Sequence, residues 1–173
     1  LKAVYKLKEM RTKKSLKIAV ASGKGGTGKT LVAVNLALSA NAKQLIDCDV
    51  EEPNVHIFLK PDAMKSELVE ILVPEIDGNK CSYCRKCAEF CQYNALFVVG
   101  ETAMVFPELC HGCGACSYLC PQDAIEEESR KIGHVELGHS DEIAFVQGRL
   151  IVGEALAPPV VRKVKERANN SGT

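Results

Sequence analysis

The sequence predicts an α/β fold in which a parallel sheet is interrupted by a small cysteine-rich insert. Three observations predict it. A glycine-rich loop stands between an apolar run and a helix-like segment, acidic residues follow a second apolar run, and one cysteine pattern occurs twice. The 173 residues suffice for one medium domain with an insert. The composition, 46% apolar and 25% charged, excludes a disordered chain.

Charge and hydropathy exclude several functions. The 22 Lys and Arg residues balance 22 Asp and Glu residues, which argues against bulk electrostatic binding to nucleic acid, so no nucleic-acid partner is expected. No apolar stretch is long enough for a membrane-spanning helix, so no membrane span is expected. The basic N-terminus lacks the apolar segment of a secretory signal.

Eight of the nine cysteines form an internal repeat. Each half reads C-x2-C-x2-C-x3-C, and the second half is the first shifted by 29 residues. The halves consist of Cys81, Cys84, Cys87 and Cys91, and of Cys110, Cys113, Cys116 and Cys120. The similarity continues past the cysteines, where Y-N-A-L at 93–96 aligns with Q-D-A-I at 122–125. Such a repeat implies a small pseudo-symmetric unit.

Three kinds of chemistry compete for these cysteines. Disulfides need an oxidising compartment, for which no signal is seen. Zinc prefers pairs of C-x2-C separated by a spacer. The run C-x2-C-x2-C-x3-C-P is the bacterial ferredoxin pattern for [4Fe–4S] clusters, in which the fourth cysteine ligates the other cluster. We therefore predict two clusters, one on Cys81, Cys84, Cys87 and Cys120, the other on Cys110, Cys113, Cys116 and Cys91. The second copy has the expected proline, Pro121, after its last cysteine. The first copy departs from the pattern, because Gln92 stands at the equivalent position.

The glycine-rich loop has the context of a phosphate-binding site. Residues 17–21 predict a strand and residues 31–38 a buried helix, and G-x4-G-K-[ST] stands between them. The candidate nucleotide ligands are Gly23, Lys24, Gly25, Gly26, Thr27, Gly28, Lys29 and Thr30. The loop amides would cradle phosphates at the helix N-terminus. Lys29 would reach the β- and γ-phosphates, and the Thr30 hydroxyl would bind Mg²⁺.

Two carboxylates follow the next predicted strand, residues 44–46. Groups at the C-terminal end of a strand in an open α/β sheet face the ligand crevice. Asp49 is therefore predicted to orient the attacking water. Asp47 is predicted to lie near the Mg²⁺ ion without binding it directly. The alternative is that both only cap a turn. Cys48 is predicted to be a buried strand residue, with a redox role as the alternative.

The chain is predicted to contain four segments. These are a basic leader (1–15), a P-loop nucleotide-binding segment (16–74), a ferredoxin-like insert (75–130) and a return segment (131–173). The leader suits a surface-lying helix or a solvated tail. The insert carries nine acidic and four basic residues, which suits docking to a basic redox partner or simply a solvated surface. The return segment predicts short strands at 134–137, 142–146 and 150–152 with glycine turns between them. A helix over 160–168 follows Pro158 and Pro159.

A second lysine, Lys24, stands early in the loop K-G-G-T-G-K-T. Here the chain resembles the MinD/ParA branch of P-loop ATPases, which includes the nitrogenase iron protein. The resemblance implies that Lys24 reaches a phosphate across an ATP-dependent homodimer, and it supports the roles of the D-x-D segment at 47–49. The whole chain resembles a MinD-superfamily P-loop ATPase with an inserted 2[4Fe–4S] ferredoxin domain. That family continues with a Walker B strand ending in Asp, and we expect this chain to stop just before it.

The resemblance implies an ATPase that couples ATP to electron transfer through two clusters, with Lys24, Lys29 and Asp49 as its catalytic residues. The alternatives are an ATP-dependent carrier of Fe–S clusters, a nucleotide-switched protein that recruits a partner, and amide synthesis, for which no glutaminase cysteine is visible. Four cysteines per cluster within one chain favour electron transfer. The expected cofactors are ATP, Mg²⁺ and two [4Fe–4S] clusters, and the expected partner is a redox or Fe–S client protein. Oxygen-sensitive clusters indicate a cytoplasmic location.

Overall fold

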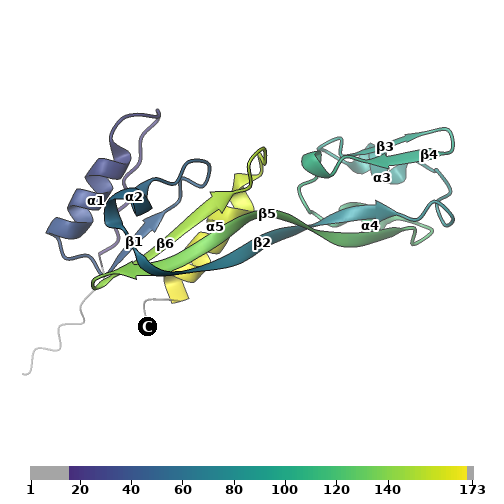
Figure 1. The fold of residues 1–173 in the computed structure, drawn as a ribbon. Helices are drawn as coiled ribbons and strands as arrows, with labels where there is room; N and C mark the ends of the chain where they lie inside the picture. The colour runs from purple at the N-terminus through teal and green to yellow at the C-terminus, as the bar shows by residue number, and fades with distance from the viewer. Residues whose placement is uncertain (1–15, 171–173) are drawn as a thin grey trace, which may run out of the picture.

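The computed structural model describes residues 16–170, which form a helix-flanked sheet and a long ribbon that leads to a cysteine-rich unit (Figure 1). The predicted basic leader, residues 1–15, lies outside the described residues. In chain order the elements are α1 (Lys29–Ser39), β1 (Gln44–Asp47), α2 (Val55–Leu59), β2 (Asp62–Ile76), α3 (Lys86–Phe90), β3 (Leu96–Val99), β4 (Thr102–Val105), the 3-10 helix η1 (Pro107–Leu109), α4 (Ala115–Leu119), β5 (Ile125–Ser140), β6 (Ile143–Leu150) and α5 (Ala157–Asn170).

The main sheet is mixed, with strand order β1-β6-β5-β2. β1 and β6 are parallel, with Asp47 opposite Gln147. The pairs β6–β5 and β5–β2 are antiparallel. The α/β class is confirmed, and the expected parallel sheet is present in part, because among the described strands only the pair β1–β6 is parallel. β5 returns directly into β6 through a tight turn at Asp141 (φ 49°), and such a hairpin makes neighbouring strands antiparallel.

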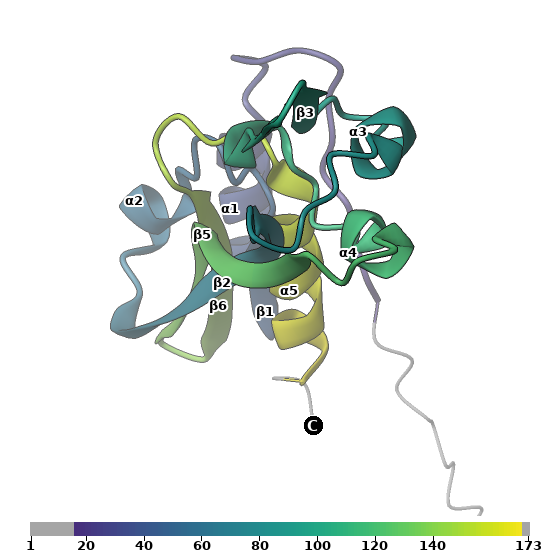
Figure 2. The same cartoon turned by 90° about the vertical axis from the view of Figure 1, so that its right-hand side faces the viewer.

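Two apolar clusters lie on opposite faces of this sheet, with α5 over one and α1 and α2 over the other (Figure 2). Val160 and Val164 of α5 are fully buried against the strands. On the other face, Phe145 of β6 is buried against α1 and α2. Burying an apolar side chain of this size contributes about 1.5–3 kcal/mol, so these contacts hold the helices on the sheet. The predicted helix over 160–168 is confirmed, and Pro158 and Pro159 lie in its first turn.

Three glycines of the return segment, Gly133, Gly138 and Gly148, lie inside strands. The sequence predicts glycine turns between residues 137 and 142 and between residues 146 and 150, but β5 runs through Gly138 and β6 runs through Gly148. A Cβ on Gly133 would lie 2.6 Å from the backbone oxygen of Arg149 and 2.8 Å from a methyl group of Val160. Gly148 in β6 is equally crowded by α5. Glycine is therefore used here for close approach of the backbone and α5.

Three further expectations for the N-terminal half need correction. Residues 17–21 form no strand, and Ile18 is 59% exposed. A strand needs a neighbour for its hydrogen bonds, and none of the strands between residues 16 and 170 pairs with this run. The predicted helix over 31–38 forms as α1, but only Val34 and Ala37 are buried. Cys48 is exposed instead of buried.

Candidate functional site

The glycine-rich loop leads directly into α1, whose first residue is Lys29. Gly26 and Gly28 have φ values of 71° and 84°, a left-handed conformation that glycine adopts without strain. The loop is held from within, because Thr27 Oγ1 donates to Ser22 Oγ (2.8 Å) and Ser22 Oγ donates to the Lys24 carbonyl (2.8 Å). The loop is thus a preformed turn at a helix N-terminus.

The space in front of this loop is open. A Cβ on any of Gly23, Gly25, Gly26 or Gly28 would meet nothing within 4 Å. Lys24 is exposed, whereas Lys29 and Thr30 are half-buried in the first turn of α1. The unpaired amides and the dipole at a helix N-terminus attract anions. This end of α1 therefore combines free amides, glycines and a lysine, the groups that bind a phosphate.

The two predicted carboxylates have different surroundings at the end of β1. Asp47 is buried. Its Oδ1 accepts a bond from the Asp49 amide (3.0 Å), and its Oδ2 accepts bonds from the amides of Asn54 and Val55 (both 3.1 Å). Asp47 thereby holds the loop that leads into α2. This is the turn-capping role that the sequence offers as the alternative. Asp49 is exposed, so its carboxylate is available to a ligand.

A buried glutamine, which the sequence patterns above do not single out, lies beside Asp47. Gln147 of β6 is opposite Asp47 of β1 and Glu136 of β5. It is 1% exposed, and its Nε2 donates to Glu136 Oε2. This polar row crosses the sheet on the face that carries α1 and α2. Its signal in the sequence is one amide residue directly after the apolar run at 143–146.

The cysteine-rich unit is a structural repeat as well as a sequence repeat. The short helices α3 and α4 are 29 residues apart. The backbone repeats in detail, since residues at positive φ also recur at this spacing. These residues are Tyr83, Arg85 and Asn94 in the first half and Gly112, Gly114 and Asp123 in the second.

Backbone amides point at four of the cysteine sulfurs in the same repeating pattern. The amides of Tyr83 and Gly112 donate to the sulfurs of Cys81 and Cys110 (both 3.4 Å). In the first half, the Ala95 amide donates to Cys91 Sγ, four residues earlier in the chain (3.4 Å). In the second half, the Ala124 amide lies 3.3 Å from Cys120 Sγ. Amide bonds to sulfur favour thiolate over thiol, which is the form that binds metal.

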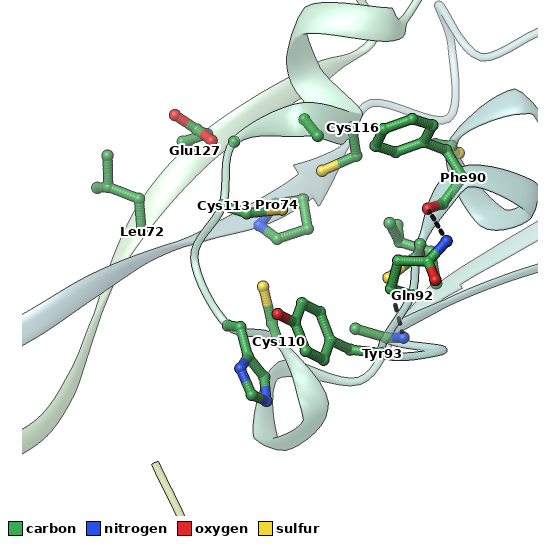
Figure 3. A pocket seen from close by; sticks show the side chains of 16 residues that line it. Leu72, Pro74, Phe90, Gln92, Tyr93, Cys110, Cys113, Cys116 and Glu127 are labelled. Carbon is green, nitrogen blue, oxygen red and sulfur yellow. Dashed lines mark hydrogen bonds between the residues drawn. The ribbon is translucent and has the colours of Figure 1, made fainter. Parts of the chain in front are cut away.

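Two cavities divide the eight cysteines. The proximal cavity, which contacts the ribbon at Leu72, Pro74 and Glu127, is lined by Cys87, Cys91, Cys110, Cys113 and Cys116 (Figure 3). The distal cavity, at the end of the ribbon beside Ile76 and Ile125, is lined by Cys81, Cys84, Cys87 and Cys120. In the proximal cavity the rings of Tyr93 and His111 are stacked, with centroids 3.6 Å apart.

The pKa values of three thiols differ with their surroundings. Burial raises the pKa of Cys116 to about 11 and also raises that of Cys87. A hydrogen bond from the Lys86 amide lowers the pKa of Cys84. Metal ligation requires thiolates, so loading the buried sites must release protons.

Each cavity is lined by several thiols, which are ligands that metal centres use. Among residues 16–170, no three His, Cys, Asp or Glu side chains converge closely enough to hold one metal ion. A [4Fe–4S] cluster instead takes four cysteines, one thiolate on each iron. Each cavity offers at least four thiols on apolar walls.

Comparison with known families decides the class of the nucleotide-binding part. The model of the CobQ/CobB/MinD/ParA nucleotide binding domain, CbiA, matches residues 18–168. The chain belongs to this family. Nucleotide binding is therefore assigned to the CbiA-type domain that contains the glycine-rich loop. No helix that the structure describes is long and apolar enough to cross a membrane.

Several curated proteins are similar to this CbiA-family chain. The uncharacterized protein MJ0578 of Methanocaldococcus jannaschii is 34% identical over 158 residues, which cover 88% of the chain and 55% of that protein. An iron-sulfur cluster carrier protein of Pyrococcus horikoshii is 47% identical over 62 residues (33% of the chain, 21% of the carrier). One subunit of an ion-translocating oxidoreductase complex of Methanosarcina acetivorans is 37% identical over 73 residues (37% and 28%). The chain thus spans about half the length of MJ0578.

Proposed function

We propose that the protein binds Mg²⁺-ATP and two [4Fe–4S] clusters and couples ATP binding and hydrolysis to electron transfer through them. One observation carries the proposal. The eight repeated cysteines line two cavities in the crossed grouping that their spacing predicts, with Cys87 lining both. These cavities lie along the ribbon that joins the cysteine-rich unit to the nucleotide-binding sheet.

The roles at the nucleotide follow from the loop. The amides of residues 23–28 and Lys29 would bind the phosphates, and the Thr30 hydroxyl would bind Mg²⁺. Asp49 would orient the attacking water, and Asp47 would fix the loop that carries Asp49. Phosphoryl transfer needs mainly positioning and charge stabilisation. Lys24 would complete the site of a second subunit in an ATP-dependent homodimer.

The roles in the cysteine-rich unit follow from the cavities. Cys81, Cys84, Cys87 and Cys120 would hold the distal cluster, and Cys91, Cys110, Cys113 and Cys116 the proximal one. When bound, the clusters would supply one-electron redox chemistry at low potential. The protein supplies the ligands, the amide bonds to sulfur and the apolar walls that exclude water. We further propose a cytoplasmic location and an unidentified redox protein as the electron-transfer partner.

The β2–β5 ribbon is the proposed connection between the two activities. Its strands pair from Asp62 opposite His139 to Ile76 opposite Ile125. β5 carries Glu136 at the sheet end, where Glu136 accepts a bond from Gln147. At the other end, β5 begins five residues after Cys120. A shift at the nucleotide site would therefore reach the cavities through continuous paired strands.

A second candidate function is delivery of Fe–S clusters timed by ATP. The similarity to an iron-sulfur cluster carrier protein favours it. The difference from electron transfer is testable, because a carrier loses its cluster to an acceptor protein, whereas an electron-transfer protein retains it.

The deciding experiment measures the cluster midpoint potentials of the anaerobically purified protein with and without Mg²⁺-ATP. A tenfold change in relative nucleotide affinity between two redox states appears as about 59 mV for a one-electron couple. We expect a shift of that order. An unchanged potential, with clusters moving to an apo-acceptor on ATP addition, would support the carrier and refute coupling.

A further inference from the structure

The two cysteine cavities differ in the charges around them. The distal cavity is lined by two cationic side chains, Arg85 and Lys86, and by no carboxylate. The proximal cavity is lined by a carboxylate, Glu127, and by no lysine or arginine. A unit built from two repeats with matching backbones thus surrounds its two sites with opposite charge.

The origin of this difference lies in the ribbon. Gly112 and Gly114 are the repeat equivalents of Tyr83 and Arg85, and all four residues have positive φ, between 54° and 71°. A Cβ on Gly112 would lie 3.1 Å from the Leu72 carbonyl, and one on Gly114 would lie 3.3 Å from Glu127 Oε1. The ribbon therefore leaves little room for side chains at positions 112 and 114 of the second repeat. It also places the carboxylate of Glu127 beside this repeat.

The first repeat has room for a side chain, but that side chain introduces strain. A non-glycine residue at positive φ is disfavoured by its Cβ, and glycine would relieve this at residue 85. Arg85 directly follows the distal ligand Cys84 and is exposed. Strained non-glycine residues cluster at functional sites, which points to a role for the charge.

The charge difference matters for reduction because each reduction adds one electron, and hence one negative charge, with no bond made or broken. Nearby cations stabilise the added charge, and a nearby carboxylate opposes it. Surrounding charge is one of the factors that set cluster potentials.

We propose that the distal site is reduced before the proximal site, that Arg85 and Lys86 raise its reduction potential, and that Glu127 lowers the potential of the proximal site. This inference rests on the proposed binding of two clusters. In the resting one-electron state, the electron occupies the end of the ribbon remote from the nucleotide-binding sheet. Transfer to the proximal site is then uphill, and it is the step that ATP-driven changes in the ribbon would favour.

Three nearby carboxylates act in the opposite sense, and two of them, Asp77 and Glu126, pair with Lys80 (3.5 and 3.7 Å). The third is Asp123, three residues after the distal ligand Cys120, whose carbonyl accepts the Asp123 amide (3.3 Å); its repeat equivalent is the neutral Asn94. Asp123 is absent from the distal lining. Neither Asp77 nor Glu126 lines the distal cavity either, so the charged side chains that line it are both cations.

The test is a reductive titration of the anaerobic, cluster-loaded protein with dithionite and redox mediators, followed by electron paramagnetic resonance. Two separate one-electron steps are expected. In the double variant Arg85→Gln/Lys86→Gln, the electron affinity of the first step should fall by roughly fivefold per charge removed. The electron affinity of the second step should not change. Glu127→Gln should instead raise the affinity of the second step.

Three controls separate charge from structure. The pair Arg85→Lys/Lys86→Arg keeps both charges and should restore the wild-type potential. Lys65→Gln removes one positive charge at an exposed position of β2, far from the cavities, and should alter neither step. In the unaltered protein, raising the ionic strength from about 0.01 M to 1 M should narrow the gap between the steps, because salt screens exposed charges.

The outcomes distinguish the two levels of inference. Two clusters of equal potential, or a shift of the second step in the Arg85/Lys86 variant, would overturn the proposed order while leaving the proposed function intact. A protein that binds no iron and sulfide would refute the proposed function itself. Cys120→Ser identifies the distal signal, since it should alter the spectrum of the step reduced first. A change confined to the second step would overturn the order.

Discussion

At the scale of single residues, Asp47 has the largest structural role among the predicted nucleotide ligands. Its two oxygens accept three backbone amides across residues 49–55. Replacing Asp47 by alanine removes the acceptor of one buried and two partly buried amides. An unsatisfied buried donor costs about 1–3 kcal/mol, so we expect Asp47→Ala to lower the free energy of unfolding by about 2–4 kcal/mol.

Urea denaturation measures this loss, and Asp47→Asn is the matched control. The amide oxygen of the new asparagine still accepts hydrogen bonds. Asp47→Asn should therefore lower the free energy of unfolding by less than half as much as Asp47→Ala does. A change below about 1 kcal/mol for Asp47→Ala, the worth of one ordinary hydrogen bond, would mean that Asp47 does not hold this loop.

At the scale of elements, the packing of α5 on the sheet depends on a glycine. A Cβ on Gly148 would lie 2.7 Å from methyl groups of Val164 and Val50 and 2.9 Å from one of Val160. Overpacking of a tight core typically costs about 1–3 kcal/mol. We expect Gly148→Ala to destabilise the protein by that amount in thermal or urea unfolding. Gly78→Ala is the control, because its new Cβ would meet only Tyr83 Oη, at 3.8 Å. Equal effects of the two variants would contradict the packing argument.

The start of α5 predicts a pH dependence. Glu154 pairs with Arg130 of β5 and accepts the amides of Ala155 and Leu156 (3.1 and 3.0 Å). Burial raises the pKa of Glu154, but the bond from Arg130 and these two amides outweigh it, and the net pKa is lowered. The ionised form therefore stabilises the fold above the ordinary value of 4.5, and this contribution is lost as the pH falls through the lowered pKa.

Urea midpoints between pH 3 and pH 6 check this prediction. The stability difference between the wild type and Glu154→Gln should be largest at pH 6 and should shrink toward pH 3. A difference that is constant over this range would show that ionised Glu154 contributes nothing.

The same elements show what sequence can predict. The strand at 44–46, the helix at 160–168 and the internal repeat follow from local pattern and spacing, and all three are present. The apolar run at 17–21 predicts a strand, but pairing depends on neighbours that a local pattern does not contain. Gly138 and Gly148 predict turns, although glycine suits close contacts inside a strand equally well. The bonds of Asp47 and the burial of Gln147 depend on tertiary contacts between β1, α2 and β6.

At the scale of the whole molecule, the β2–β5 ribbon connects two structural units. The sheet has its own apolar clusters, drawn from α1, α2, α5 and all four strands. The cysteine-rich unit has a separate set of short helices and the hairpin β3–β4. Small units of this kind gain much of their stability from bound metal. Occupancy of the cavities should therefore not depend on a bound nucleotide.

The substitution Lys29→Ala tests this independence. It removes the cation of the first turn of α1 without altering a buried contact, because Lys29 is only half-buried. We expect nucleotide binding to be lost, by equilibrium dialysis with labelled ATP, while the visible absorption and iron content of the anaerobic protein remain unchanged. The matched variant Lys24→Ala should keep nucleotide binding and lose only ATP-dependent dimerisation, measured by light scattering. If Lys29→Ala removed both nucleotide and iron, the two units would form a single cooperative structure. The ribbon would then carry folding energy as well as any signal between ATP and the clusters.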